Sequence, residues 1–369
     1  MATLREAVYR GMAERGISGR AADESWEKLH GFASFGFPES HSVSFAYIVY
    51  MSAWLRYHWP AEYLAGLLNA QPMGFYSPNS LIQDAQHHGV IVLGPCVNRS
   101  SHDAVVEPVE ADPSDIVSFL GSSWRRGRGP VEDPVRPAVA VRLGLSQVRN
   151  LGTAEIARVE TARMLGGPFA SPADLAQRTG LPLDALEGLA AAGALSSVGL
   201  GRREGLWSAG ALAEMGPGRL PLAPGADPPG LGEMGERERH LADLWSMGAS
   251  TSHPISFVRD ELRAGGCRTV AEVLGLRRNV RDVRVGGVVT HRQRPGTANG
   301  VIFFNLEDET GLLNVVVLPP VWESQRDVAR RLPALVVEGF VEHRDGVTNL
   351  VAHRFTPIPV TGAGSRDFR

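Results

Sequence analysis

The chain has 369 residues, of which 43% are hydrophobic and 21% are charged, and its formal net charge is −3. These values exclude a wholly disordered, collagen-like or disulfide-rich protein, and at roughly 150 residues per domain the length predicts two or three domains. No apolar run approaches the roughly 20 residues of a membrane helix, and no secretory signal opens the chain, so we expect a cytoplasmic protein with no membrane partner.

Helices are expected over about the first 30 residues. A glycine-punctuated aromatic turn follows at 32–41, Phe-Ala-Ser-Phe-Gly-Phe-Pro-Glu-Ser-His, and leads into a long apolar helix over 42–58. Pro60 then opens a helix over 61–68, because proline is well accommodated in the first turn of a helix. These aromatic-rich helices predict a segment that needs a packing partner.

The next stretch, 71–143, mixes helix and strand in short pieces. We expect a helix at 79–88, a strand at 90–93, a loop-rich section at 98–137 and a strand at 139–143. This pattern predicts a connecting α/β segment rather than a separate core.

A helical region is expected over 144–207, and its first turn has a recognisable form. The run Val-Arg-Asn-Leu-Gly at 148–152 fits the helix-hairpin-helix turn, apolar-x-Gly-apolar-Gly, with asparagine in place of the first glycine. Asparagine is the next-best residue for a left-handed backbone. Such a turn presents free N–H groups at a helix start to a DNA phosphate; the alternative is plain helix packing. The candidate DNA-binding residues are Arg149, Asn150, Gly152 and Thr153, with Thr153 expected to cap the helix.

A second helical unit follows, with helices at 172–178, 183–192 and 202–207, and Arg202 and Arg203 are further candidate DNA contacts. The stretch 208–232 is rich in proline and glycine and is expected to be a linker.

The linker contains Arg-Leu-Pro-Leu at 219–222, which resembles leucine-rich peptides that dock on sliding clamps but lacks their leading glutamine and terminal aromatic residue. A helical connector is expected over 233–280, with helices at 233–244 and 255–264.

The last domain, 281–358, has the pattern of a small β barrel, followed by a tail at 359–369. Five strands are expected, with one helix between the third and the fourth: strands 283–290, 301–306, 312–318, 334–342 and 347–352, and helix 320–331. Five strands with a helix after the third is the plan of the OB fold, a common platform for single-stranded nucleic acid.

Arginines concentrate at the entry to this barrel and in its first loop, and the candidate DNA contacts among them are Arg281, Arg284, Arg292 and Arg294. The loop from 292 to 300 is expected to be long, basic and mobile, as a guide for a phosphate backbone would be. The adjacent Phe303 and Phe304 must face opposite sides of a strand. One is expected in the core and the other stacked on a base; the alternative is that both are packed inside.

Catalytic motifs are missing. The chain has no Asp-x-Asp with which to hold two metal ions, no phosphate-binding loop and no nucleophile elbow. The densest acidic run, Glu307 to Glu309, is expected to be a solvated β-turn. Two distant cysteines and the adjacent His87 and His88 lack metal-site spacing. The sequence therefore predicts no cofactor, no metal and no self-sufficient active site.

The run over 32–42, Phe-Ala-Ser-Phe-Gly-Phe-Pro-Glu-Ser-His-Ser, and the aromatic positions that follow it up to Leu68 resemble the bacterial C-family DNA polymerases, the relatives of the DNA polymerase III alpha subunit. The Pro-Glu pair, together with Phe45, is similar to the error-prone, damage-induced branch; the replicative branch usually has Asn-Lys and a tyrosine there. The resemblance continues to the Ser-Arg-Asp-Phe ending at 365–368 and covers essentially the whole chain.

The resemblance implies the C-terminal third of such a polymerase. The fold class would be multidomain α + β: a helical remnant of the fingers over 1–70, a tandem helix-hairpin-helix region and a C-terminal OB-fold β barrel. The intact enzyme would perform template-directed nucleotidyl transfer with Mg²⁺, and its palm aspartates would lie outside this chain.

The resemblance also implies roles for residues and partners. Ser40, His41 and Phe45 would lie near the incoming dNTP, with His41 as a donor to the triphosphate and Phe45 beside the base or sugar; alternatively His41 only caps its helix. The hairpins would grip duplex DNA and the barrel would meet single-stranded template. Mutagenesis accessory proteins, and through them the sliding clamp, are the expected protein partners.

Three hypotheses stay open at this point. The chain is a DNA-binding fragment of an error-prone polymerase without activity of its own, a stand-alone single-stranded nucleic-acid-binding accessory module, or a structural module whose barrel binds a protein.

Overall fold

We describe the protein from a computed structural model, in two compact units, residues 1–59 and 60–369. The described residues are 2–34, 39–74, 76–109, 139–219, 227–276, 278–344, 346–359 and 366–368. Arg277 and Asp345 lie outside them, as does most of the clamp-like run at 219–222.

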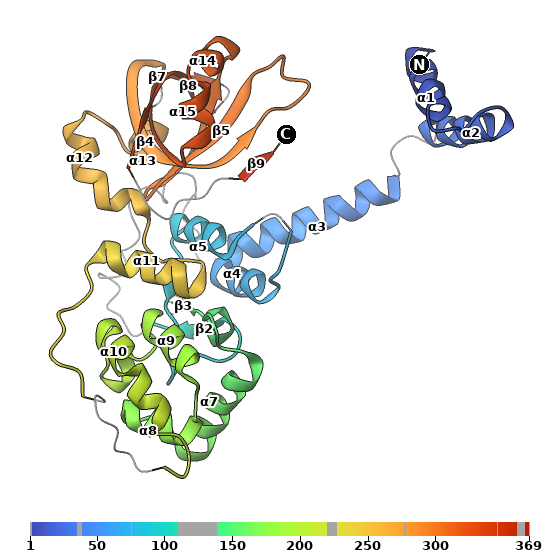
Figure 1. Ribbon diagram of the computed structural model, residues 1–369. Coiled ribbons are helices and arrows are strands. Elements are labelled where there is room, and N and C mark those ends of the chain that lie inside the picture. The colour runs from blue at the N-terminus through green and yellow to red at the C-terminus, as the bar shows by residue number, and fades with distance from the viewer. Residues whose placement is uncertain are drawn as a thin grey trace. The chain divides into compact units, whose positions relative to one another are not determined.

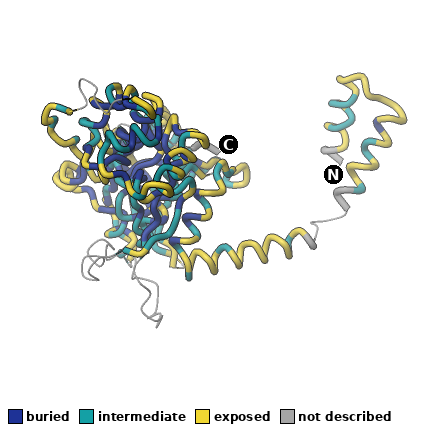
Figure 2. Tube along the Cα trace, turned by 90° about the horizontal axis from the view of Figure 1, so that it is seen from below, coloured by how far each residue is buried: buried dark blue, intermediate teal, exposed yellow. Residues whose placement is uncertain are grey.

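The first unit consists of three helices, α1 (Ala2–Ala13), α2 (Arg20–Ser34) and α3 (Glu39–His58). Tyr9 joins the first two, because its hydroxyl donates to Asp23 over 2.8 Å and its ring lies 6.1 Å from that of Trp26. Figure 2 shows α3 mostly exposed from His41 onward. Among the described side chains of this unit, Ala22 is the only buried hydrophobic one, so the unit has almost no core of its own.

The second unit begins with α4 (Pro60–Asn69), α5 (Pro78–His87) and a three-stranded sheet. The strands are β1 (Ile91–Leu93), β2 (Val105–Pro108) and β3 (Val139–Arg142). β3 lies in the middle, parallel to β1 and antiparallel to β2. β2 falls in the stretch expected to be loop, and residues 110–138 are outside the described part.

The helical region follows (Figure 1), with η1 (Leu145–Gln147), α7 (Thr153–Gly166), α8 (Pro172–Thr179), α9 (Leu183–Ala191), η2 (Ser196–Val198), α10 (Arg202–Glu214) and α11 (Glu236–Met247). Its buried side chains form one core with those of α4, α5 and the small sheet. The helix expected to end at residue 207 continues to Glu214, because Ala209 and Leu212 extend its apolar face into that core. The prediction of linker from residue 208 was therefore wrong over its first seven residues.

The connector contains η3 (Pro254–Val258), α12 (Arg259–Ala264) and the unpredicted α13 (Val270–Leu274). His253 caps η3, because its Nδ1 accepts a hydrogen bond from the Ile255 N–H over 3.2 Å. The single helix expected over 255–264 is thus a 3₁₀ turn followed by a short α-helix.

The barrel is built from β4 (Val280–Gln293), β5 (Ile302–Asp308), β6 (Gly311–Val317), β7 (Ala334–Arg344) and β8 (Val347–Pro357). The sheet order β5-β6-β8-β7-β4 closes on itself, because β5 also pairs with β4. α14 (Pro319–Ser324) and α15 (Arg326–Arg331) lie between the third and fourth strands of the barrel (Figure 1), and β9 (Arg366–Phe368) runs parallel to β4. The predicted multidomain α + β fold with a C-terminal OB barrel is confirmed.

Alternating residues fill the barrel. Ile302, Phe304 and Leu306 of β5 are buried in one cluster with residues from every other strand of the barrel, whereas Phe303 faces the opposite side and is half-buried. Each fully buried side chain of this size contributes about 1.5–3 kcal/mol, so the period-two pattern alone largely fixes which face of β5 is inside.

Candidate nucleic-acid interface

The first hairpin turn, residues 149–152, has the backbone that the sequence predicts. Asn150 has φ 61°, which confirms the left-handed conformation expected there, and Leu151 is buried. Gly152 has extended φ and ψ and is the N-cap of α7, so Thr153 is the first helical residue and not the cap. Arg149, Asn150, Gly152 and Thr153 are all exposed. The turn therefore presents the start of a fourteen-residue helix to the outside.

Two neighbours hold this turn in place. A Cβ on Gly188 of α9 would lie 2.3 Å from the Arg149 carbonyl oxygen, so only glycine allows α9 to pack this closely against the turn. The Arg149 N–H donates to the Ser246 carbonyl at the end of α11 over 2.7 Å. The turn is thus fixed by α9 on one side and α11 on the other.

A carboxylate of the chain itself lies at this helix start. Hydrogen bonding to its own backbone N–H, the Arg158 guanidinium and the Gly152 N–H hold the pKa of Glu155 below its usual range. Arg158 donates to Glu155 over 2.9 Å and to the Gly180 carbonyl over 2.7 Å. Part of the donor capacity of the helix start is therefore already used by an internal anion.

A second turn repeats the first, forty-nine residues later. Asn-Leu-Gly-Thr-Ala-Glu at 150–155 and Gly-Leu-Gly-Arg-Arg-Glu at 199–204 correspond position by position. Gly199 has φ 81°, Leu200 is buried, and Gly201 is an extended N-cap whose N–H donates to Glu204 over 3.3 Å. The resemblance implied a tandem helix-hairpin-helix region, but the sequence interpretation did not identify this second turn, although the shared Leu-Gly-x-x-Glu signal was there to find it.

The arginines that open α10 both pair with carboxylates of α11. Arg202 donates to the Ala191 carbonyl over 2.8 Å and pairs with the buried Asp243 of α11 over 2.7 Å. Arg203 donates to both oxygens of Glu238 over 2.7 Å. Because α11 supplies carboxylates at this position, these two arginines attach α11 to α10, and their contact with DNA stays a prediction.

Two of the four candidate arginines of the barrel, Arg292 and Arg284, are bonded within the chain. Arg292 lies within β4 and is 5% exposed; its guanidinium donates to the carbonyls of Ala329 and Leu332. The predicted loop therefore does not begin at residue 292, because β4 extends farther than expected, and the DNA contact of Arg292 stays a prediction. Arg284 donates to the Gly265 carbonyl and pairs with Glu338 over 3.1 Å.

The two remaining candidates of the barrel, Arg281 and Arg294, are exposed. Phe304 is fully buried against Phe355 and Trp322, at ring distances of 5.8 and 6.2 Å. Phe303 faces the opposite side of the sheet, so of the two phenylalanines it is the one placed to stack on a base.

The candidate nucleotide-pocket residues lie at the start of α3. His41 and Phe45 are exposed and are one helical turn apart, with ring centroids separated by 4.4 Å. Ser40 lies in the first turn of the same helix, and its side chain is outside the described part. The His41–Phe45 pair gives this end of α3 one aromatic face.

The acidic run at 307–309 is not the solvated turn that the sequence predicts. Asp308 has no exposed surface and Glu307 is 7% exposed. Arg259 donates to Asp308 over 2.7 Å and to Glu309 over 2.8 Å, and the Val270 N–H donates to Asp308 over 2.9 Å. The turn is covered because α5, η3 and α12 pack onto it, which sequence patterning alone does not reveal.

Buried titratable groups surround this turn. His87 Nε2 must donate to the Asp308 carbonyl, 2.9 Å away, and His87 Nδ1 then faces Glu307 Oε1 at 3.6 Å. Burial, with Asp84 and Asp308 nearby, raises the pKa of Glu307 to about 8. Burial lowers the pKa of His87, and it lowers the pKa of His253 to about 3. At neutral pH this cluster therefore holds a protonated carboxyl and neutral imidazoles.

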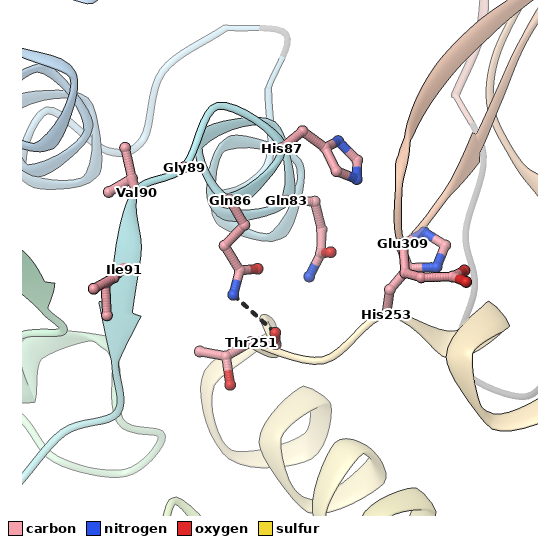
Figure 3. A pocket seen from close by; sticks show the side chains of 9 residues that line it. All are labelled: Gln83, Gln86, His87, Gly89, Val90, Ile91, Thr251, His253 and Glu309. Carbon is pink, nitrogen blue, oxygen red and sulfur yellow. Dashed lines mark hydrogen bonds between the residues drawn. The ribbon is translucent and has the colours of Figure 1, made fainter. Parts of the chain in front are cut away.

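A cavity of about 180 Å³ opens beside this cluster (Figure 3). Gln86 of α5 donates to the Thr251 carbonyl across one side, and His253 and Glu309 line the other. Pockets that hold small molecules or cofactors are usually roughly 300–1,000 Å³. The cavity is too small for such a ligand, and the polar contacts around it join α5 to the segment before η3 and to the barrel.

Neither a metal site nor a membrane-spanning helix is found in the described ranges. There, no group of three or more histidine, cysteine, aspartate or glutamate side chains is arranged to hold a metal ion. The described residues therefore do not fit the Mg²⁺ of a polymerase. Within the same ranges, no helix is both long enough and apolar enough to cross a membrane.

Two family models match the chain. The model described as a helix-hairpin-helix motif matches residues 89–205, which contain both turns. The model described as an OB-fold nucleic acid binding domain matches residues 283–358, which form the barrel. The segment between them, with α11, η3, α12 and α13, lies outside both matches.

The chain is also similar over its whole length to curated proteins named error-prone DNA polymerase. The proteins from Nocardia farcinica and Mycobacterium bovis are each 44% identical to it. The chain spans about a third of their length, 31% and 32%. A solved asparaginyl-tRNA synthetase from Pyrococcus horikoshii, 24% identical, aligns over 27% of this chain and 24% of its own with a TM-score of 0.22, which supports no inference.

Proposed function

We propose that this chain, which is related over its whole length to about a third of the bacterial error-prone DNA polymerases, supplies the DNA-binding part of such a polymerase during damage-induced translesion synthesis. The observation that carries this proposal is the first hairpin turn, whose left-handed Asn150 and exposed helix start lie inside the helix-hairpin-helix match. By itself the chain binds DNA and does not synthesise it.

Duplex DNA is the proposed ligand of the hairpin region. The exposed start of α7 offers N–H groups and the positive end of a helix dipole to one backbone phosphate, and Arg149 adds a full charge beside it. The second turn has the same backbone but its arginines are held by α11, so the first turn is the principal contact.

Single-stranded template is the proposed ligand of the barrel. Arg281 and Arg294 give it exposed charge, and Phe303 gives it an aromatic surface away from the core. Charge and stacking together are what sequence-tolerant single-strand binding requires.

The remaining roles concern the intact polymerase. There, His41 and Phe45, with Ser40, would border the pocket of the incoming dNTP, and Mg²⁺ would be held by aspartates of the remaining part. Mutagenesis accessory proteins are the proposed route to the sliding clamp.

Fluorescence anisotropy with a labelled primer–template tests the proposal. We expect binding at low salt that weakens as salt rises, and no primer extension with Mg²⁺ and dNTPs. Undetectable binding at low salt would favour a module whose barrel binds a protein, and robust synthesis by the chain alone would refute the assignment of catalysis to the missing part.

A matched pair of variants locates the duplex site. Thr153→Glu and Leu183→Glu each add one negative charge at the exposed first residue of a helix, α7 and α9 respectively. We expect T153E to weaken duplex binding about fivefold, which is the roughly 1 kcal/mol of one like-charge contact in water, and L183E to weaken it less. Equal effects of the two variants would argue against the hairpin site.

A second experiment mixes this chain with the polypeptide that corresponds to the rest of the relatives' length. It distinguishes a part of a polymerase from a stand-alone accessory module. Restored primer extension is expected for a polymerase part. A chain that binds single-stranded DNA but never restores synthesis is instead an accessory protein.

A further inference from the structure

Trp245 of α11 lies beside the first hairpin, although α11 is outside both matched domains. The buried residues of this helix, His240, Asp243, Ser246 and Met247, recur at the spacing of one helical face. Trp245 and Leu241, four residues apart, lie on another face and are 46% and 38% exposed. A large aromatic side chain is thus kept at the surface by a helix whose other face is anchored.

The Arg149 guanidinium lies over the ring of Trp245, with its central carbon 5.1 Å from the ring centroid. A guanidinium at this distance from an indole is attracted to the ring face, and tryptophan is the best aromatic residue for this interaction. The backbone supports the same placement, because the Arg149 N–H donates to the carbonyl of Ser246, the residue after the tryptophan.

Both members of this pair remain accessible, since Arg149 is exposed and Trp245 is nearly half exposed. A free arginine side chain loses substantial rotamer entropy when it must hold one geometry for a ligand. The ring imposes that geometry in advance, beside the exposed start of α7. Arg202 and Arg203 at the second turn differ, because carboxylates of α11 neutralise them.

We propose that Trp245 is a positioning residue of the duplex-binding site: its ring holds the Arg149 guanidinium where it meets the backbone phosphate bound at the first hairpin. The inference rests on the proposed function, since it needs duplex DNA as the ligand. It extends the interface from the helix-hairpin-helix region to α11, which no family match includes.

A double-mutant cycle on duplex DNA tests this. Trp245→Ala is expected to weaken binding about two- to fivefold, as an exposed cation–π contact would, while Trp245→Phe retains most of the affinity. Arg149→Ala alone is expected to lower the slope of log K against log salt by about 0.9. Adding Trp245→Ala to Arg149→Ala is expected to cause no further loss of duplex affinity.

Trp207→Ala is the matched control, because Trp207 is a similarly exposed tryptophan on the adjacent helix α10, at 58%. It should leave duplex affinity unchanged. Thermal unfolding of each variant checks that α11 is still in place.

The outcomes separate the two proposals. If the unaltered chain does not bind duplex DNA, the proposed function fails and this inference fails with it. If the chain binds but Trp245→Ala has no effect, or weakens binding equally with and without Arg149, only the positioning role is overturned.

Discussion

The helix-hairpin-helix region and the barrel treat their arginines in the same two ways. Each region leaves cations exposed beside its proposed DNA surface, Arg149 in the first and Arg281 and Arg294 in the second, and each uses others internally, among them Arg202 and Arg292. In the sequence these arginines look alike. In the structure the internal ones are those for which a carboxylate or an unpaired carbonyl lies within reach.

The difference between the regions lies in what the internal arginine meets. Arg202 pairs with a buried carboxylate, Asp243, and so neutralises a charge, and Arg292 donates to the carbonyls that end α15. Loss of Arg202 should therefore be costly, because it leaves a buried carboxylate without its cation. Neither this loss nor that of Arg292 should alter DNA affinity much.

The largest effect is expected for Arg202→Ala. This substitution leaves the Asp243 carboxylate, whose side chain is 8% exposed, without its cation, and breaking one side of such a pair costs about 3 kcal/mol. Urea denaturation followed by circular dichroism measures the loss. Adding Asp243→Asn in the same chain should recover part of it, because the buried charge is then gone. A loss below about 1 kcal/mol, with weakened DNA binding, would restore Arg202 as a DNA contact.

The barrel counterpart, Arg292→Ala, is expected to cost about 2 kcal/mol, from lost hydrogen bonds and the space left beside Phe304. Its affinity for single-stranded DNA should equal that of the unaltered chain. If affinity falls while the free energy of unfolding stays the same, then Arg292 reaches the surface in solution and the parallel with Arg202 breaks.

The sequence predicted the framework well and the internal contacts poorly. Alternation along β5, the left-handed Asn150 and the barrel plan follow from local rules, since neighbouring residues determine them. The fates of Arg202, Arg292 and Asp308 depend on segments from tens to about two hundred residues away: α11, α15, α12 and α5. No local pattern contains that information. The repeat of the two turns was visible in sequence, but only as a comparison between 150–155 and 199–204.

The buried acids at the base of the barrel give a third, smaller effect, through pH. In the folded state the pKa of Glu307 is raised to about 8, so its carboxyl keeps a proton that the unfolded chain loses above about 4.5. The stability contributed by this group is therefore lost as pH rises through 8. The lowered pKa values of His87, His240 and His253 act oppositely, and their contribution is complete by pH 6.5.

The free energy of unfolding should therefore fall between pH 6.5 and 8, by at most about 1.4 kcal/mol per pH unit. Glu307→Gln keeps a neutral polar group of the same shape and should flatten this range. Denaturant titrations at several pH values give the comparison. If the free energy of unfolding falls equally with pH in the unaltered chain and in Glu307→Gln, then Glu307 is ionised throughout this range. Other contacts would then hold α5 against the barrel.

The smallest changes in free energy are expected when the exposed arginines are replaced. These substitutions test directly whether the hairpin region and the barrel bind different DNA structures. Arg149→Ala should weaken binding to blunt duplex about fivefold, close to 1 kcal/mol for one phosphate contact, and leave binding to single strands nearly unchanged. Arg294→Ala should do the reverse.

Each variant should lower the slope of log K against log salt only for its own ligand. The decrease should be about 0.9 for Arg149→Ala with duplex and about 0.7 for Arg294→Ala with single strands. Stability should not change, because neither guanidinium is needed to neutralise a buried carboxylate. If both variants weaken both ligands equally, the two regions form one continuous electrostatic surface. The division of labour between hairpin and barrel would then reflect position along one DNA rather than selectivity for different DNA structures.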